Sequence, residues 1–332
     1  MSLLNSPLNG LMYFGKLPLR ADFVRSSAGA AVTQSLDRWI SAAMERLSAH
    51  PDWKTHFDCA APIDFAFCSP RSGNLLVGHM LSSRDSSGRR YPFLLATALK
   101  AEEPQASIAH LPLIAAPVWT RMQALARELG EATDLIAALE RLEQTPVADE
   151  ALTLDRARAA FADLLAKTNL GELERGMSQA GNRLALRSTV LASGLLLMPL
   201  LSATPPSGGA SQGLALPIPA NPPACIHAAA LWMQLVAPFF ARSDIELGLF
   251  ITRLNDRPQL VLSLQGASPR LLEAIYNPAE AFNANIDMCE ADWVEDHVDG
   301  DYALRKLSDY LAHPNLSLRQ AFTTYAEVFL GA

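Results

Sequence analysis

The pattern of apolar and polar positions in the first hundred residues predicts one amphipathic helix followed by three strands. In "GAAVTQSLDRWISAAMERLSAH", residues 29–50, apolar side chains recur every three or four positions, which is the period of a helix with one buried face. Strand-like runs then begin at Ile63, Asn74 and Tyr91, and the segments "SPRSG" and "RDSSGRR" between them are rich in turn-forming residues. The simplest arrangement of these strands is an antiparallel meander.

The middle of the chain predicts helices and one linker. Between Pro117 and Leu170 the apolar spacing is again helical. Residues 188–203, "STVLASGLLLMPLLSA", carry no charge but are fewer than the ~20 residues that span a bilayer. We expect a helix buried between layers and broken near Pro199, the alternative being a re-entrant or peripheral membrane segment. "SATPPSGGASQG", residues 202–213, is the strongest linker or exposed-loop signal in the chain.

The last third of the chain predicts further strands and helices. In "IELGLFITRLNDRPQLVLSLQG" two alternating runs flank Asn255 and Asp256, which is typical of a hairpin. Helical patterns occupy residues 231–240, begin again at Ser268, and return near residues 303–311 and 318–330. Because strands and helices do not alternate regularly, we predict an α/β (α+β) fold with a mixed or antiparallel sheet flanked by helices.

Length and composition suggest how this fold is divided. The chain has 332 residues, of which 50% are hydrophobic and 18% charged, the profile of a folded soluble protein. Since one domain is typically ~150 residues long, we predict an N-terminal α/β domain (1–140), a helical segment with the linker (141–212) and a C-terminal α/β unit (213–332). The strands of the last part either form their own sheet, which we favour, or join the first.

Charge and targeting signals indicate the class of partner. The net charge is −7, with 12 basic and 9 acidic residues up to Arg121 and 15 and 25 after it. Nucleic-acid binding depends on phosphate neutralisation, and the chain has no block of Lys and Arg, so a protein partner fits better. The start "MSLLNSPLNG" lacks the features of a signal peptide. We therefore expect a cytoplasmic protein without nucleic acid and without stable membrane insertion.

No familiar catalytic, cofactor or metal motif is present in the sequence. The four cysteines form no CxxC pair, no GxSxG elbow occurs, and His79 in a strand run is best interpreted as structural. In "YFGKLPLRADFV", residues 13–24, Gly15 and Lys16 lack the second glycine and the Ser or Thr of a phosphate-binding loop. With Pro18 close behind, a turn at the end of a strand is the better interpretation.

Two further stretches concentrate charge. In "SSRDSSGRRYP", residues 82–92, Asp85 is placed to accept backbone N–H groups, Gly88 to adopt positive φ, and Arg89 to bridge to a carboxylate, for which Asp22 is plausible. The run "DMCEADWVEDHVDGD", residues 287–301, lacks the ligand spacing of an EF-hand. It predicts a solvated surface, or acids at the start of the helix near Ala303.

Taken together, the two motifs resemble the N-terminal domain of the TagF family, also called ImpM, accessory proteins of bacterial type VI secretion systems. The family pattern runs aromatic-Gly-Lys-Leu-Pro, Gly-Asp-Phe-Val, a Trp-containing helix and Pro-Ser-x-Asp-x-x-Gly-Arg-x-aromatic-Pro. This chain departs from it at Ala21 and Ser82, where the family usually has Gly and Pro. The residues that fit are Phe14, Gly15, Lys16, Leu17, Pro18, Asp22, Phe23, Val24, Trp39, Ser83, Asp85, Gly88, Arg89, Tyr91 and Pro92.

This resemblance implies a profilin- or longin-like N-terminal domain and a function without catalysis. The implied function is post-translational repression of type VI secretion assembly through the forkhead-associated scaffold protein of the system, with no cofactor. Some relatives carry a fused phosphatase domain, but Asp299-Gly300-Asp301 lacks its glycines, so that activity is not carried over. The candidate partner-binding residues are Gly15, Lys16, Pro18, Asp22, Phe23, Trp39, Ser83, Asp85, Gly88, Arg89 and Pro92.

The charges of the two motifs predict that they are neighbouring loops, joined by an Asp22–Arg89 or an Asp85–Lys16 pair. Maintenance of the fold alone is the alternative role for both. A different class of function is an enzyme that acts on a phosphorylated or metal-bound substrate through Asp85, Arg89 and the 287–301 acidic run. A structural component of the secretion apparatus, which would self-assemble, is a third hypothesis.

Overall fold

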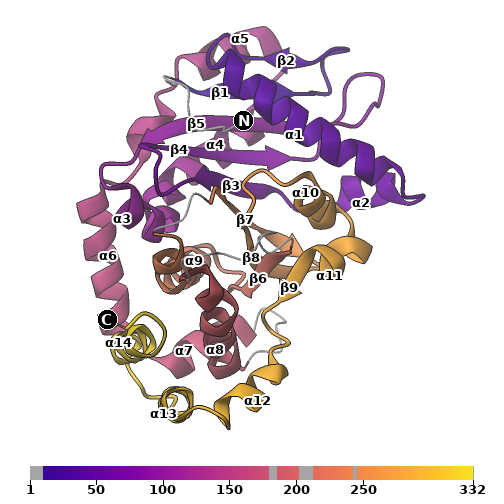
Figure 1. Ribbon diagram of the computed structural model, residues 1–332. Helices are drawn as coiled ribbons and strands as arrows, with labels where there is room; N and C mark the ends of the chain where they lie inside the picture. Colours follow the sequence, from indigo (N-terminus) through magenta and orange to yellow (C-terminus); the bar gives the residue numbers. More distant parts are fainter. Residues whose placement is uncertain (1–9, 179–184, 202–211, 242–244, 332) are drawn as a thin grey trace.

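A computed structural model describes residues 10–178, 185–201, 212–241 and 245–331, and places their strands in one nine-stranded sheet (Figure 1). The order across the sheet is β2-β1-β5-β4-β3-β7-β8-β6-β9. The strands are β1 (Met12–Gly15), β2 (Val24–Arg25), β3 (Ile63–Cys68), β4 (Asn74–Leu81), β5 (Phe93–Lys100), β6 (Gly213–Pro217), β7 (Leu247–Leu254), β8 (Arg257–Ser263) and β9 (Asn285–Asp287).

The sheet is mixed, as the sequence predicted. β3, β4 and β5 form the expected antiparallel meander, and β6 pairs with β9 in parallel. The strands after Gly213 join the first sheet, so the separate second sheet that we favoured is wrong and the alternative arrangement is correct. The junction is antiparallel pairing of β3 with β7, from Asp64 opposite Ile251 to Cys68 opposite Leu247. The division of the chain at residues 140 and 212 stays a prediction.

The β7–β8 hairpin is built as its turn residues predicted. Asn255 and Asp256 connect the two strands, and their φ angles are 50° and 62°. Two successive residues with positive φ match the right-handed twist of the flanking strands, and Asn and Asp tolerate this conformation better than most residues.

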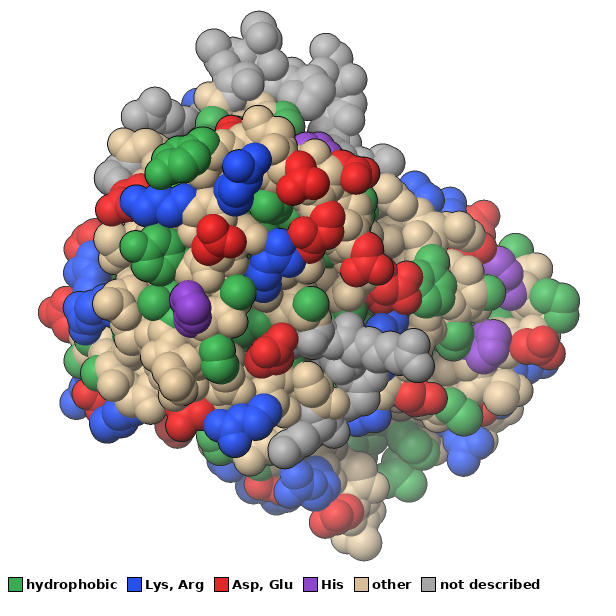
Figure 2. Space-filling model, turned by 90° about the horizontal axis from the view of Figure 1, so that it is seen from below, with side chains coloured by type: hydrophobic (Ala, Val, Ile, Leu, Met, Phe, Trp, Pro, Cys, Tyr) green, Lys and Arg blue, Asp and Glu red, His purple; other side chains and the backbone are tan. Residues whose placement is uncertain are grey.

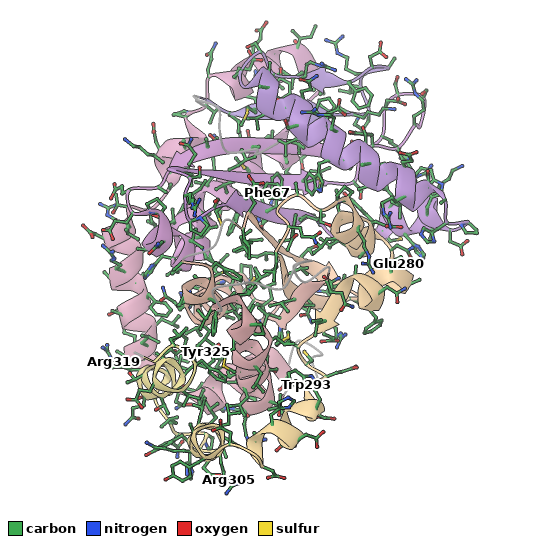
Figure 3. All side chains as sticks on the ribbon, viewed as in Figure 1. Phe67, Glu280, Trp293, Arg305, Arg319 and Tyr325 are labelled. Carbon is green, nitrogen blue, oxygen red and sulfur yellow. The ribbon has the colours of Figure 1, made fainter. Side chains whose placement is uncertain are left out.

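Helices cover both faces of the sheet. On one face, α1 (Ala30–Ser48), α2 (Trp53–Cys59) and α10 (Pro269–Tyr276) enclose an aromatic core that includes Phe67 (Figure 3). On the other face, α4 (Leu111–Glu131) and α9 (Pro222–Val236) pack against each other. The remaining α-helices are α3 (Pro104–Ala109), α5 (Leu135–Glu143), α6 (Leu154–Lys167), α7 (Leu170–Ser178), α8 (Leu186–Leu197), α11 (Ala281–Ala284), α12 (Glu295–Val298), α13 (Tyr302–Leu311) and α14 (Leu318–Phe329).

The uncharged stretch after residue 188 forms the buried helix that the sequence predicted. α8 ends at Leu197 and a 3₁₀ turn, Met198–Leu201, follows at Pro199. The hydroxyl of Thr189 donates to the carbonyl of Met288 at 2.9 Å, so the polar side chain is satisfied inside the protein. The predicted linker, apart from Gln212 and Gly213, lies outside the described residues.

Among the described residues, one helical stretch is long and apolar enough to cross a membrane by length and composition. It is Pro222–Phe240, and 61% of its most apolar window is buried inside the protein. Core helices of soluble proteins meet the same criterion.

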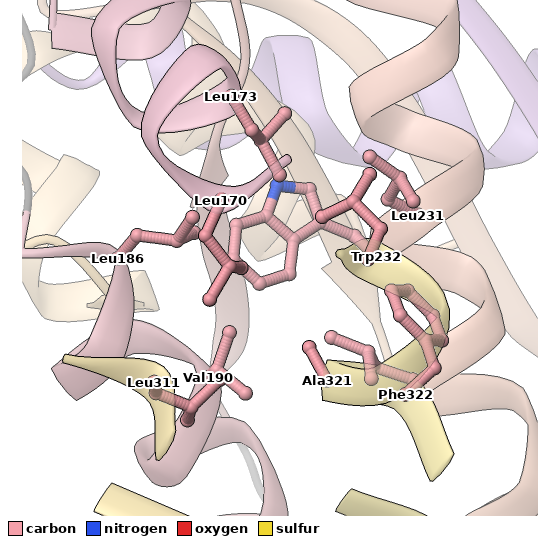
Figure 4. Close-up of a pocket in the computed structure, with 11 residues that line it drawn as sticks. Leu170, Leu173, Leu186, Val190, Leu231, Trp232, Leu311, Ala321 and Phe322 are labelled. Atoms are coloured by element: carbon pink, nitrogen blue, oxygen red, sulfur yellow. The ribbon is translucent and has the colours of Figure 1, made fainter. Parts of the chain in front are cut away.

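A small apolar cavity of about 20 Å³ lies among α7, α8, α9, α13 and α14 (Figure 4). It is lined by Leu170, Leu173, Leu186, Val190, Leu231, Trp232, Leu235, Leu311, Leu318, Ala321 and Phe322. The indole N–H of Trp232 donates to the carbonyl of Pro217 at 2.7 Å. Because the lining is apolar, we expect the cavity to be a dry packing void.

Candidate functional site

A buried ion pair joins the two sequence motifs. The ammonium group of Lys16, directly after β1, lies 2.9 Å from the Oδ2 atom of Asp85, which lies in the loop between β4 and β5. The Lys16 side chain is 8% exposed and the Asp85 side chain is 0% exposed. β1 and β5 are adjacent strands, so the sheet itself brings the ends of these loops together. The predicted Asp85–Lys16 pairing is confirmed.

Asp85 also organises its own loop, as predicted. Its Oδ1 atom accepts the backbone N–H groups of Ser87 at 3.0 Å and Arg89 at 2.9 Å, and the Ser87 hydroxyl at 2.7 Å. Gly88 has φ of 83°, so the backbone turns in a conformation that favours glycine. One carboxylate therefore fixes both the shape of the loop and its attachment to Lys16.

The predicted Asp22–Arg89 pairing is wrong. The Nε atom of Arg89 donates to Asp85 at 2.7 Å, and its Nη2 atom donates to the carbonyl of Ala21 at 2.6 Å. Asp22 is exposed and forms no ion pair with Arg89 in the described chain. Asp85 lies four residues before Arg89 and is already held in place, whereas Asp22 would lose hydration to reach it.

Further hydrogen bonds hold the two loops together. The hydroxyl of Ser83 donates to the carbonyl of Lys16 at 2.6 Å, and the N–H of Ser86 donates to the carbonyl of Arg20 at 2.9 Å. Gly15 has φ of 134°, and a Cβ atom there would lie 2.1 Å from the carbonyl oxygen of Pro92. The absence of a side chain at Gly15 therefore allows the backbones of the two motifs to approach each other closely at Pro92.

The outer surface of these loops is exposed, and we name residues 18–23 and 86–89 together the loop platform. Leu19 is 57% and Phe23 is 41% exposed. The ring of Phe23 stacks on Phe14, with 5.3 Å between centroids, and the Lys16 ammonium lies 5.1 Å from its centre. A groove of about 420 Å³ borders the platform and reaches Leu139 of α5. Leu19 was not among the residues that the sequence indicated as candidates for partner binding. The signal that could have identified it is an apolar side chain inside a turn.

The motif residues do not all belong to the platform. Pro18, Asp22, Phe23, Gly88 and Arg89 are exposed on it, whereas Gly15, Lys16, Ser83, Asp85 and Pro92 support it from below or from the side. Trp39 lies elsewhere: it belongs to α1 and its ring is buried in the core on the inner side of that helix, with its centroid 5.2 Å from that of Phe67. Its exposed fraction is 4%, so the inclusion of Trp39 among candidate partner-binding residues is not supported by its position.

The acidic run does not converge on Asp85. Its charged residues lie mostly on the exposed surface around α12 and α13, where Figure 2 shows acidic side chains beside Lys and Arg. Glu295 pairs with Arg187 at 2.5 Å, and Asp301 accepts the N–H groups of Ala303 and Leu304 at the start of α13. Both predicted roles, a solvated surface and a helix start, are confirmed.

No group of three or more His, Cys, Asp or Glu suited to a metal occurs in the described ranges.

The surroundings of Asp85 set its protonation. Burial alone raises its pKa, but hydrogen bonds from Ser87, Lys16 and Arg89 outweigh burial and hold the pKa well below its usual range. A carboxyl with a lowered pKa in the folded state stabilises the fold above its unfolded pKa of ~3.9, and this contribution is lost as the pH falls below that value.

We therefore expect Asp85→Asn to lower the free energy of unfolding at neutral pH, with a difference from wild type that shrinks as the pH falls below about 4. Urea unfolding of both proteins between about pH 3 and pH 7 measures this difference. Asp22→Asn, on the same platform but outside the ion pair, is the control and should keep the wild-type free energy of unfolding at neutral pH. A wild-type-like profile for Asp85→Asn would contradict the electrostatic role.

Comparison with known proteins agrees with the resemblance of the motifs. Residues 12–145 match the model of the TagF N-terminal domain, described as type VI secretion system-associated. No curated protein matches the chain. Among solved structures, the crystal structure of PA0076 from Pseudomonas aeruginosa PAO1 is similar, at 21% identity and a TM-score of 0.36.

The alignment with PA0076 covers 41% of this chain and 62% of that one, so the chain spans less than two thirds of that relative. The family match ends at residue 145 and includes both loops of the platform together with their buried Lys16–Asp85 pair. The specific motif combination and the family match lead to the same conclusion: residues 12–145 form a TagF N-terminal domain, a domain described as type VI secretion system-associated.

Proposed function

We propose that this protein is a non-enzymatic repressor of type VI secretion system assembly that acts in the cytoplasm. In this proposal it binds the forkhead-associated scaffold protein of the system through the loop platform. The observation that carries the proposal is the combination of exposed apolar side chains with a rigid buried support. Leu19 and Phe23 face solvent, while the Lys16–Asp85 pair fixes the loops that present them.

Rigid presentation favours binding. A surface that is ordered before it meets its partner loses little conformational entropy on association, and exposed aromatic side chains are frequent centres of binding energy. Phe23 is held by stacking on Phe14 and by an edge contact with Tyr91 at 4.8 Å between centroids. The protein thus offers a prepared contact rather than a mobile loop.

The charge of the platform indicates which charge the partner surface should carry. Arg20, Arg84 and Arg89 are exposed in or beside the platform, while the exposed acids near them are Asp22 and, beside Arg84, Asp58. The chain as a whole is acidic, with a net charge of −7, whereas the platform carries a local excess of positive charge. We expect the complementary surface of the scaffold to be acidic around an apolar centre.

The test is a pull-down of the purified scaffold by wild type and by the double variant Leu19→Ala, Phe23→Ala. We expect the double variant to lose at least about tenfold in affinity, because both exposed apolar contacts are removed. Tyr302→Ala is the matched control, since Tyr302 is 81% exposed but belongs to α13. Circular dichroism checks that all three proteins are folded. Wild-type binding by the double variant would count against the platform.

The other hypotheses predict different observations. An enzyme that uses Asp85 together with the 287–301 acids needs them in one pocket, and Asp85 is instead fully engaged by Lys16, Ser87 and Arg89. A structural component of the apparatus predicts stable self-assembly, which light scattering of the free protein measures. We favour binding because the platform presents contact surface and its charged centre is neutralised.

A further inference from the structure

A groove of about 520 Å³ lies where the two parts of the sheet meet. It is formed by β3, β4 and α4 from the family domain and by β7, β8, α9 and the segment after β6 from the later part of the chain. Its size falls within the range of roughly 300–1,000 Å³ that is common for small-molecule sites. The groove exists only because β3 pairs with β7, so it is a feature of the whole chain and not of the family domain alone.

A buried polar group lies in the lining of this groove. The Nδ1 atom of His79 is 2.7 Å from Oδ1 of Asp64, its cross-strand neighbour, and Gln123 of α4 donates to Oδ2 of Asp64 at 2.7 Å. His79 is 5% exposed. Asp64 orients the imidazole through Nδ1, which leaves Nε2 as the ring nitrogen available to a ligand. The structural role expected for His79 accounts for one nitrogen only.

Two arginines also line the groove. Arg127 of α4 and Arg253 of β7 come from opposite sides of the β3–β7 junction and are both exposed. Arg253 donates one hydrogen bond to the carbonyl of Asp256, and no ion pair of Arg127 occurs among the described residues. Asp64 is the acid in the lining, so Arg127 and Arg253 give the groove a positive charge. Guanidinium groups bind carboxylates and phosphates with paired hydrogen bonds.

The cysteine in the lining does not suggest thiolate chemistry. Burial, assisted by the nearby charge of Asp64, raises the pKa of Cys225 to about 12. The thiol is therefore protonated at neutral pH and is a poor nucleophile. Cys225 is therefore not a candidate nucleophile in this groove.

We propose that this groove binds a small anionic molecule, whose carboxylate or phosphate group contacts Arg127 and Arg253 and whose remaining polar group reaches His79. The apolar part of the lining, which includes Ile218 and Ile251, would contact the body of the ligand. Because the ligand contacts both parts of the chain, its binding stabilises their association across the β3–β7 junction.

The experiment is calorimetric titration of the full chain with inorganic phosphate and, separately, with citrate, at constant ionic strength. The two probes distinguish a phosphate site from a carboxylate site. We expect saturable binding of at least one probe, weakened about tenfold or more by Arg127→Ala or Arg253→Ala, because each removes a charge-assisted contact. Arg319→Ala is the matched control, since Arg319 is an exposed arginine on α14, outside the groove (Figure 3).

A second readout locates the bound probe. Titration should shift the imidazole NMR signal of His79, which His79→Gln identifies by its disappearance. Absence of saturable binding for both probes would overturn the proposal. Equal weakening by Arg127→Ala and Arg319→Ala, or binding that leaves the His79 signal in place, would overturn it as well, since the anion would then be bound elsewhere.

Discussion

Gly15→Ala is expected to lower the free energy of unfolding by about 3 kcal/mol or more, since overpacking and a strained backbone conformation add together. Gly15 has φ of 134°, a conformation that side chains rarely adopt. The added Cβ would also lie 2.1 Å from the carbonyl oxygen of Pro92 and 2.7 Å from the Cα of Phe93, both backbone atoms that have little freedom to move. The clash falls in the β1–β5 pairing that supports the loop platform.

Gly88→Ala is the matched control for this substitution. Gly88 also has positive φ, 83°, but nothing lies within 4 Å of a Cβ placed there. We expect a loss of only about 1 kcal/mol, from backbone strain alone. Urea unfolding of both variants measures the difference, and equal losses would show that the close approach of Gly15 to Pro92 contributes nothing.

A fragment that ends at residue 145 is expected to fail to remain a folded monomer. The family match ends there, but the sheet does not, because residues 64–68 of β3 pair with β7. In the fragment this row of backbone groups would be unpaired, and the face of α4 that packs on α9 would be exposed. Both changes favour association or aggregation.

Size-exclusion chromatography with light scattering, together with circular dichroism, compares the fragment with the full chain. The expected result is a soluble, cooperatively unfolding full chain and a fragment that associates or unfolds without cooperativity. A fragment that is monomeric and unfolds cooperatively would show that residues 12–145 are an independent domain and that the β3–β7 pairing is dispensable.

Local patterns predicted most of the elements, because their causes are local. The helical spacing of residues 29–50, the three strand runs and the Asn255–Asp256 turn each lie within one short segment. The partner of β3 was not predictable in the same way. β3 and β7 are far apart in the sequence, and alternation of side chains decides which face of a strand is buried but not which edge it pairs with. The sequence therefore left two arrangements open.

The same distinction applies to the candidate site. Spacing within the second motif predicted the loop around Asp85 and the positive φ of Gly88, and opposite charge suggested Lys16 as the partner. Charge alone also suggested Asp22 for Arg89, which is wrong because burial, not charge, decides which carboxylate is held in place. The exposure of Leu19 depends on how the two loops pack, which no local pattern encodes.

Release of a type VI effector from living cells tests the proposed repression most directly. The host bacterium lacks its own copy of the gene and carries wild type, the Leu19→Ala, Phe23→Ala double variant, or the Tyr302→Ala control, at equal protein levels. We predict that wild type and Tyr302→Ala suppress release, and that the double variant does not. Full suppression by the double variant would contradict repression through the loop platform.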